Sequence, residues 1–147
     1  MRIDGVTNTG ATPALAAMLS FSAQRHRLIT HNVANISTPD FRPTDVSPKR
    51  FQEALSDAVD QRRRQTGGEH GGLRFKRTDE LQPLSRGGFR VHGTTAGDNV
   101  LFHDRNNRDV ERMMQDLVEN AGVFRTAGEL LRTQTDQLRR AISERAG

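Results

Sequence analysis

Apolar residues recur at helical spacing in two segments, one near each end of the chain. The first segment runs from Ala14 to about Ile36, with Ser22 and His26 as polar steps within it. Its apolar positions follow steps of four and three: Leu15, Leu19, Ile29, Val33 and Ile36. This spacing places side chains on one face of an α-helix. The pattern therefore predicts an N-terminal core helix over residues 13–37.

The residues that flank this segment indicate where the helix begins and ends. Thr12 is a favourable N-cap, and Pro13 is tolerated at the first helical position because the N–H that it lacks would have no partner there. Pro39 disfavours the α conformation for Thr38, so we expect the helix to end near Ser37.

Two asparagines, Asn32 and Asn35, lie in the last turns of the predicted helix, within the stretch HNVANISTPDF. Backbone carbonyls lose their helical partners at such an end. An amide side chain carries both donors and acceptors. We therefore expect these amides to satisfy the helix end or a neighbouring stretch of backbone.

The C-terminal segment carries the clearest periodic signal in the chain. Ten positions alternate steps of four and three, which is the spacing of a coiled-coil seam. They are Val110, Met114, Leu117, Ala121, Phe124, Gly128, Leu131, Thr135, Leu138 and Ile142. We predict a C-terminal core helix over 107–146, capped by Asn107 or Asp109. Because charged and amide residues fill its other faces, this seam needs a partner helix.

Between the two helices the sequence predicts little regular structure. Residues 51–64 form an amphipathic pattern and are expected to be a short helix. Residues 65–104 are rich in Gly and Arg, so we expect a variable, flexible middle in which GLRF and FRV become extended only against a partner. The predicted fold is a single, mainly α domain over 1–147, in which the terminal helices form an α-helical hairpin or coiled-coil-like core.

Composition narrows the possible functions. The chain is 33% hydrophobic and 5% aromatic, and it has no Cys, which excludes disulfides and thiolate metal sites. The N-terminus lacks the basic and apolar regions of a secretory signal, and no stretch approaches the ~18 apolar residues of a membrane span. Five scattered His residues lack metal-ligand spacing, and residues 104–115 lack the Gly and Glu of a calcium loop. We therefore expect no metal or other cofactor.

Catalytic motifs give no support to an enzyme. No glycine-rich segment has phosphate-binding spacing, and no nucleophile stands near a base in a recognisable motif. Residues 62–90 hold eight Lys and Arg against three acidic residues, within a chain of net charge +4. A basic segment of this kind can bind phosphates, so a helical nucleic-acid-associated protein that acts through 62–90 is an alternative. Only Phe75 and Phe89 could stack on bases there, which favours a solvated insert.

Two stretches resemble bacterial flagellar axial proteins. Residues 19–41, LSFSAQRHRLITHNVANISTPDF, are similar to the N-[IV]-A-N-x-x-T-P-G-[YF] signature that ends the N-terminal helix of that family. The matching positions are Asn32, Val33, Ala34, Asn35, Thr38, Pro39 and Phe41. The AQR run at 23–25 and TDVSPKRFQEAL at 44–55 resemble the proximal rod proteins of the basal body (FlgB-like).

The C-terminal segment agrees with this resemblance. Residues 106–131, NNRDVERMMQDLVENAGVFRTAGELL, are similar to the family's N-N-x-D-[LVM]-[DE] start of a long helix with a later N…[YF] pair. The matching positions are Asn106, Asn107, Asp109, Val110, Glu111, Asn120 and Phe124. Asp40 replaces a Gly of the family pattern, Phe41 a Tyr, and Arg105 and Arg108 a Gly and a Val. If the backbone at Asp40 requires a positive φ, Asp tolerates it less well than Gly but better than most residues.

The resemblance implies a structural role without catalysis. Such rod proteins are exported through the flagellar type III export apparatus without a cleaved signal. They assemble helically in the periplasmic space above the membrane ring, with other copies, other rod subunits and the membrane-ring adaptor as partners. The terminal helices would supply the assembly core, and the junction motif at 32–41 would connect the N-terminal helix to the rest of the chain. The expected function is to build, with other rod proteins, the drive shaft that flagellar motility requires.

Overall fold

In a computed structural model, residues 9–68, 70–95 and 110–145 are described, and they form a mainly helical fold. The elements are α2 (Thr12–Ala34), β1 (Thr44–Asp45), α3 (Pro48–Thr66), β2 (Leu81–Pro83), β3 (Phe89–Val91), β4 (Thr94–Thr95) and α4 (Val110–Arg145). The predicted fold class is confirmed, since the N- and C-terminal helices pack together. The predicted caps at 107 and 109 lie outside the described residues.

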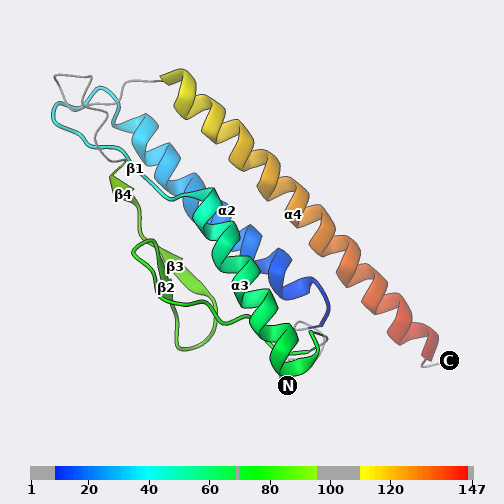
Figure 1. The fold of residues 1–147 in the computed structure, drawn as a ribbon. Coiled ribbons are helices and arrows are strands. Elements are labelled where there is room, and N and C mark those ends of the chain that lie inside the picture. Colours follow the sequence, from blue (N-terminus) through cyan, green and yellow to red (C-terminus); the bar gives the residue numbers. More distant parts are fainter. Residues whose placement is uncertain (1–8, 69, 96–109, 146–147) are drawn as a thin grey trace.

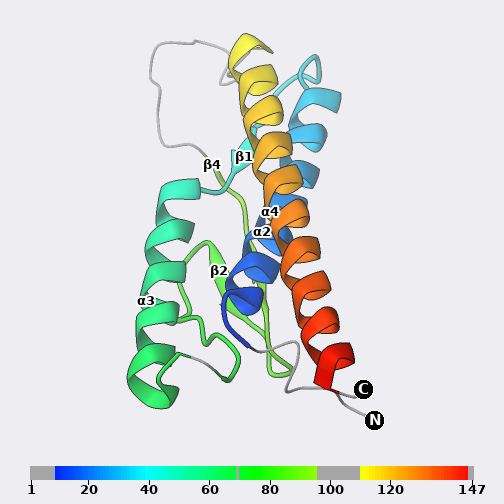
Figure 2. The same cartoon turned by 90° about the vertical axis from the view of Figure 1, so that its right-hand side faces the viewer.

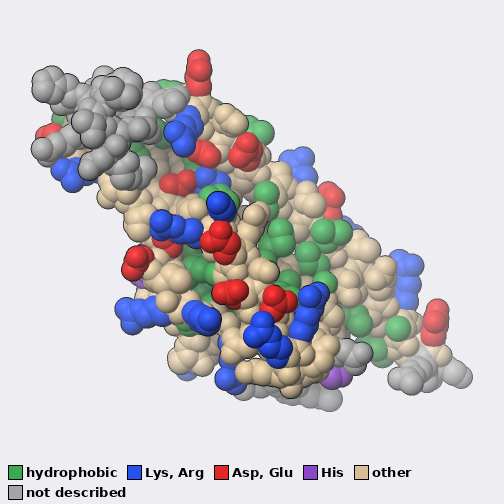
Figure 3. Space-filling view, viewed as in Figure 1, with side chains coloured by type: hydrophobic (Ala, Val, Ile, Leu, Met, Phe, Trp, Pro, Cys, Tyr) green, Lys and Arg blue, Asp and Glu red, His purple; other side chains and the backbone are tan. Residues whose placement is uncertain are grey.

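Helix α2 lies at the centre of the molecule. Helix α4 runs antiparallel along one side of it, and α3 and the short strands cover the other side (Figures 1 and 2). Hydrophobic side chains remain visible on the surface between α3 and α4 (Figure 3). The central helix therefore buries side chains on more than one face.

The strands form two small antiparallel pairs. β1 pairs with β4 through Thr44 opposite Thr95, and β2 pairs with β3 through Gln82 opposite Arg90. A tight turn closes the second pair, with Gly87 at φ 90° and Gly88 at φ 79°, a backbone region that favours glycine. We expected FRV at 89–91 to become extended only against a partner. That expectation was wrong, because β3 is paired within the chain.

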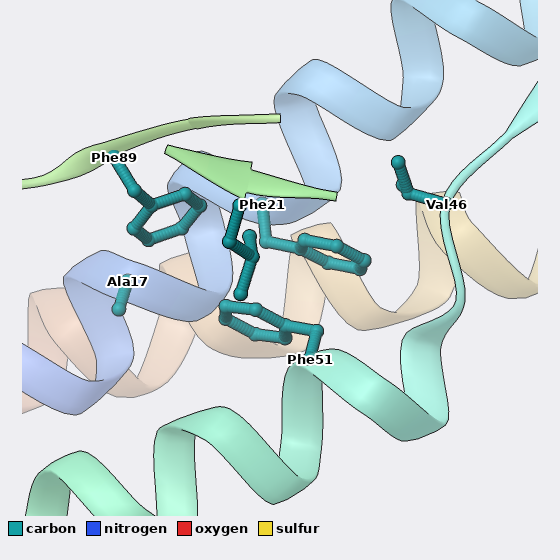
Figure 4. Packing of buried hydrophobic residues seen from close by; sticks show 6 residues of the cluster. Ala17, Phe21, Val46, Phe51 and Phe89 are labelled. Carbon is teal, nitrogen blue, oxygen red and sulfur yellow. The ribbon is translucent and has the colours of Figure 1, made fainter. Parts of the chain in front are cut away.

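The hydrophobic core is aromatic and lies between α2, α3 and the strands (Figure 4). Phe21 and Phe51 stack with ring centroids 4.0 Å apart, and Phe51 lies 5.5 Å from Phe89. Phe75 completes the group, 4.8 Å from Phe89 in an edge-on arrangement. Two of the four rings come from the segment that composition had suggested would not pack. Four aromatic side chains bury enough apolar area to order it.

Helix α3 is longer than the predicted 51–64. The Ser47 hydroxyl accepts a hydrogen bond from the N–H of Arg50 at 3.3 Å, and Pro48 occupies the first turn. At the other end Gly67 has φ 70°, the left-handed conformation typical of a helix C-terminus. Amphipathic spacing alone therefore missed about one turn at the start of the helix.

The start of α2 also differs from the prediction. Ala11, not Thr12, is the N-cap residue, and no side chain caps the helix. Thr12 is the first helical residue, and its buried hydroxyl has no hydrogen-bond partner among the described residues. The helix ends at Ala34, and residues 35–37 form turns.

Candidate assembly surface and supporting junction

The amide of Asn32 pairs with the backbone of β1. Its nitrogen donates to the carbonyl of Thr44 at 2.8 Å, and its oxygen accepts from the N–H of the same residue at 3.1 Å. Asn32 is 5% exposed. The buried side chain of Asn32 thus pairs with both backbone groups of Thr44, as a neighbouring strand would. These groups would otherwise be left unpaired.

Asn35 closes the end of α2. Its amide nitrogen donates to the carbonyl of His31 at 2.8 Å, and its own carbonyl accepts from the N–H of Thr38 at 2.9 Å. The prediction for the two amides is therefore confirmed. Asn35 satisfies the helix end, and Asn32 satisfies the backbone of a neighbouring strand. Val33 and Ile36 lie half-buried beside them, while Ala34 is exposed.

The rest of the junction makes a sharp turn. Thr38 and Pro39 are exposed, and the Phe41 ring lies 5.5 Å from the His31 ring. Asp40 has φ 58°, and it is the only non-glycine residue with a positive φ in the described ranges. The position at which the family pattern has Gly therefore does require a left-handed backbone.

A second amide of α2 binds β3 in a similar way. Gln24 donates to the carbonyl of Phe89 at 3.2 Å and accepts from the N–H of Val91 at 2.9 Å. Sequence reasoning gave Gln24 no role, although it lies in the AQR run. The two amides hold the two strand pairs against the central helix.

Arg25 connects three elements and is 5% exposed. Its guanidinium binds both carboxylate oxygens of Asp45, with Nε to Oδ1 at 3.0 Å and Nη2 to Oδ2 at 2.7 Å. Nη2 also donates to Asp116 of α4 at 3.1 Å. Burial acts to lower the pKa of Arg25, but hydrogen bonds and charge from Asp45 and then Asp116 outweigh it, so the pKa is raised. The cation therefore stays charged and ties α2 to both β1 and α4.

Helix α4 is also held by a buried amide. Asn120 is 4% exposed, and its amide nitrogen donates to the carbonyl of Ser22 at 2.8 Å. Ala127 is 1% exposed, and a side chain at Gly128 would approach Leu19 at 3.7 Å. Small residues therefore let the two helices approach closely, and the amide fixes their register.

The face of α4 that contacts α2 is rotated from the predicted seam. Met113, Asn120 and Ala127 are its buried positions, each one residue before a predicted one. Leu117, Leu131 and Leu138 of the predicted set are half-buried, as are Gly128 and Thr135. Leu15 and Leu19 are half-buried on α2, and Ile29 is buried.

The remaining predicted seam residues face away from the body. Val118, which lies outside the predicted seam, is exposed beside them. We call Val110, Met114, Val118, Ala121 and Phe124 the outer stripe of α4. The four large members are between 43% and 71% exposed. Ile142, near the end of the helix, is 55% exposed. A role of these residues in assembly stays a prediction.

The basic residues of 62–90 do not share one environment. Arg62 is buried, and it donates to the carbonyls of Gly10 at 2.8 Å and His70 at 3.3 Å. Arg63 lies 3.6 Å from Asp60. The other six are exposed on the end of α3 and on residues 70–95: Arg64, Arg74, Lys76, Arg77, Arg86 and Arg90.

Within the part of the chain that the structure describes, no helix is long and apolar enough to cross a membrane, and no group of acidic or His side chains is arranged to hold a metal ion. A scan against protein-family models and a search of the curated proteins found no match to this chain.

Proposed function

We propose that this chain is a structural subunit of the proximal rod of a bacterial flagellar basal body, and that it assembles helically with copies of itself and other rod subunits. The observation that carries the proposal is the outer stripe of α4. Val118 is 71% exposed, and Val110, Met114 and Phe124 are each more than 40% exposed. Apolar side chains gathered along one side of a helix mark a site of protein contact.

The residues on which the resemblance rests also support the proposal. Asn32 and Asn120 each donate to backbone of another element at 2.8 Å, and Asn35 donates to the last turn of its own helix at 2.8 Å. Their work is architectural, as expected for a chain whose activity is to hold a shape. The antiparallel packing of α2 on α4 is the arrangement that the resemblance implies for the assembly core.

In this proposal the outer stripe is covered by neighbouring subunits. The partners are further copies, other rod subunits and the membrane-ring adaptor, and the chain reaches the periplasmic space through the flagellar type III export apparatus. A contact between unlike surfaces of identical subunits generates a helical filament when its rotation does not close into a ring.

Deletion of the gene in its native bacterium tests the proposal. We expect cells without flagellar motility, with basal bodies that stop at the membrane ring, and restoration of both by the wild-type gene. Complete basal bodies in the deletion strain would contradict it. Steeply salt-dependent binding of the purified chain to duplex DNA, together with normal basal bodies, would support the nucleic-acid alternative instead.

A further inference from the structure

A groove runs between α3 and α4, and α2 forms its floor. It encloses about 540 Å³. Most of its lining surface is apolar, and the apolar side chains include Ala14, Met18, Phe21, Leu55, Val59 and Val123. Figure 3 shows hydrophobic side chains at the surface between α3 and α4. The walls are helical and the floor is apolar, which is the form of site that accepts one face of an amphipathic helix.

Charged residues line the rim of this groove. Glu119 stands on the α4 wall, and Asp60 and Arg63 stand on the α3 wall as a pair 3.6 Å apart. Gln115 donates to Glu119 at 3.3 Å, but no cation is paired with Glu119 among the described ion pairs. A helix that carries basic residues beside its apolar edge therefore matches this rim.

The C-terminal part of α4 is such a helix. Gly10, next to the start of α2, lies level with Gln134, whose side-chain nitrogen would be 3.4 Å from a Cβ at that glycine. Residues 135–145 continue beyond this level for about 16 Å at ~1.5 Å per residue, and Figure 1 shows this end of α4 extending past α2 and α3. The extension is part of the same chain as the groove.

The extension carries an apolar edge and basic neighbours. Leu131, Leu138 and Ile142 are spaced so that they share one face of the helix. Ile142 is 55% exposed, so this face is open at its end. Arg132 and Arg139 lie on the adjoining side and are exposed, with Asp136 between them at 4.0 and 3.6 Å. The edge continues the face that α2 covers further up the helix.

We infer that the projecting end of α4 from one copy lies in the α3–α4 groove of a second copy. This inference deepens the proposed assembly role and rests on it. Ile142 and Leu138 contact Met18 on the floor and Val59 on the α3 wall, and the basic side of the helix lies along Glu119. The groove and the projecting helix are different surfaces, so the contact is heterologous and repeats from copy to copy.

One such contact is weak. A helix end of this length covers less than the ~800 Å² per partner of a standard stable interface. Isolated subunits are therefore expected to associate weakly, and the contact gains strength only when each subunit is also held by other neighbours in an assembly. The test must capture a short-lived pair.

The chain has no cysteine, so single introduced thiols report on this contact. Ser56→Cys places a thiol on the groove wall, and Ser143→Cys places one on the projecting end of α4. Both positions are exposed. The two full-length proteins are mixed and treated with a short bis-maleimide, whose spacer tolerates a shift of one helical turn. Ser85→Cys, exposed at the far turn of the β2–β3 pair, is the matched control for Ser56→Cys.

We expect the mixture of Ser56→Cys and Ser143→Cys to give at least tenfold more cross-linked dimer than the mixture of Ser85→Cys and Ser143→Cys. Adding Val59→Glu to the Ser56→Cys protein should remove that excess, because a charge then enters the apolar part of the α3 wall. Equal yields with the two partners, or a product formed mainly between two Ser143→Cys chains, would overturn the inference.

A cellular experiment separates this inference from the proposed function. If Val59→Glu restores basal bodies in the deletion strain as well as wild type does, the groove inference fails and the rod function stands. If the deletion strain builds complete basal bodies, the rod function fails whatever the cross-linking shows.

Discussion

The two sides of α2 are held by different interactions. On the side of α3 and the strands, Phe21, Phe51 and Phe89 form a dry aromatic core, each 5% exposed or less. On the side of α4, the buried contacts are made by Arg25, Asn120, Met113 and Ala127, while Met114, Val118 and Phe124 stay exposed. The aromatic side supplies most of the stability through burial, whereas the polar side fixes the register of α4.

For the rod subunit that we propose, this difference would let the chain fold and still leave apolar surface for a neighbouring molecule. An α4 that buried its largest apolar residues against α2 would leave little for a neighbouring molecule. Polar contacts at Asn120 and Asp116 hold the helix in an orientation that leaves Met114, Val118 and Phe124 exposed. Substitutions in the contacts that hold the fold and substitutions in the exposed residues of α4 should therefore have different effects on folding and on assembly.

Phe51→Ala should have the largest effect on stability. It removes the ring that stacks on Phe21 at 4.0 Å, and such a cavity costs about 3–5 kcal/mol. Phe124→Ala is the matched control, because the same atoms are removed from a side chain that is 44% exposed. Denaturant unfolding followed by circular dichroism measures both. Equal losses would mean that the aromatic side is not the main source of stability.

Arg25→Met, on the polar side of α2, should destabilise the protein less than Phe51→Ala does. The substitution leaves the carboxylates of Asp45 and Asp116 without their cation, but these side chains are 35% and 32% exposed and can be hydrated. We expect a loss of roughly 1–3 kcal/mol in the free energy of unfolding. Gln24→Met, on the neighbouring α2 position, tests whether the loss is specific to charge. If Arg25→Met left the free energy of unfolding unchanged or raised it, the ion pairs would fix the positions of the helices without adding stability.

Asn32→Ala and Asn35→Ala form a matched pair within one motif. Asn32 is buried and makes two hydrogen bonds to Thr44, so its loss should cost about 1–3 kcal/mol. Asn35 is half-buried and makes one side-chain bond at a helix end, which is worth about 0.5–1.5 kcal/mol. Thermal unfolding of the two variants ranks them. The reverse order would contradict the assignment of the strand-like role to Asn32.

Asp40→Gly should give the smallest change, and in the opposite direction. Asp40 is exposed at φ 58°, where a left-handed backbone costs an L-residue about 1–2 kcal/mol. The greater freedom of glycine in the unfolded chain offsets part of that gain. We expect a stabilisation below about 1 kcal/mol in denaturant unfolding. A clear loss would show that the Asp40 carboxylate itself stabilises the junction.

Local signals in the sequence predicted the helices and the junction, because helix period, Pro39 and paired amides act through near neighbours. Ser47-Pro48 and Gly67 are local signals of the same kind, and they would have placed both ends of α3. The bonds that join Gln24 to Phe89 and Arg25 to Asp45 reach residues at least 20 positions away, so no spacing in the sequence reveals them. The rotation of the α4 seam has the same cause. Contact with the distant helix α2 decides that Asn120 and Ala127 are buried.

We propose that the outer stripe of α4 is an assembly surface and that the chain folds without it. Met114→Asp places a charge on that stripe, and Gln115→Asp places the same charge on the next exposed residue, away from the stripe. The most direct measurement is incorporation of each variant into basal bodies of the deletion strain, with thermal unfolding of both purified proteins beside it. We predict near wild-type unfolding for both and loss of incorporation for Met114→Asp alone. Normal incorporation of Met114→Asp would contradict the account.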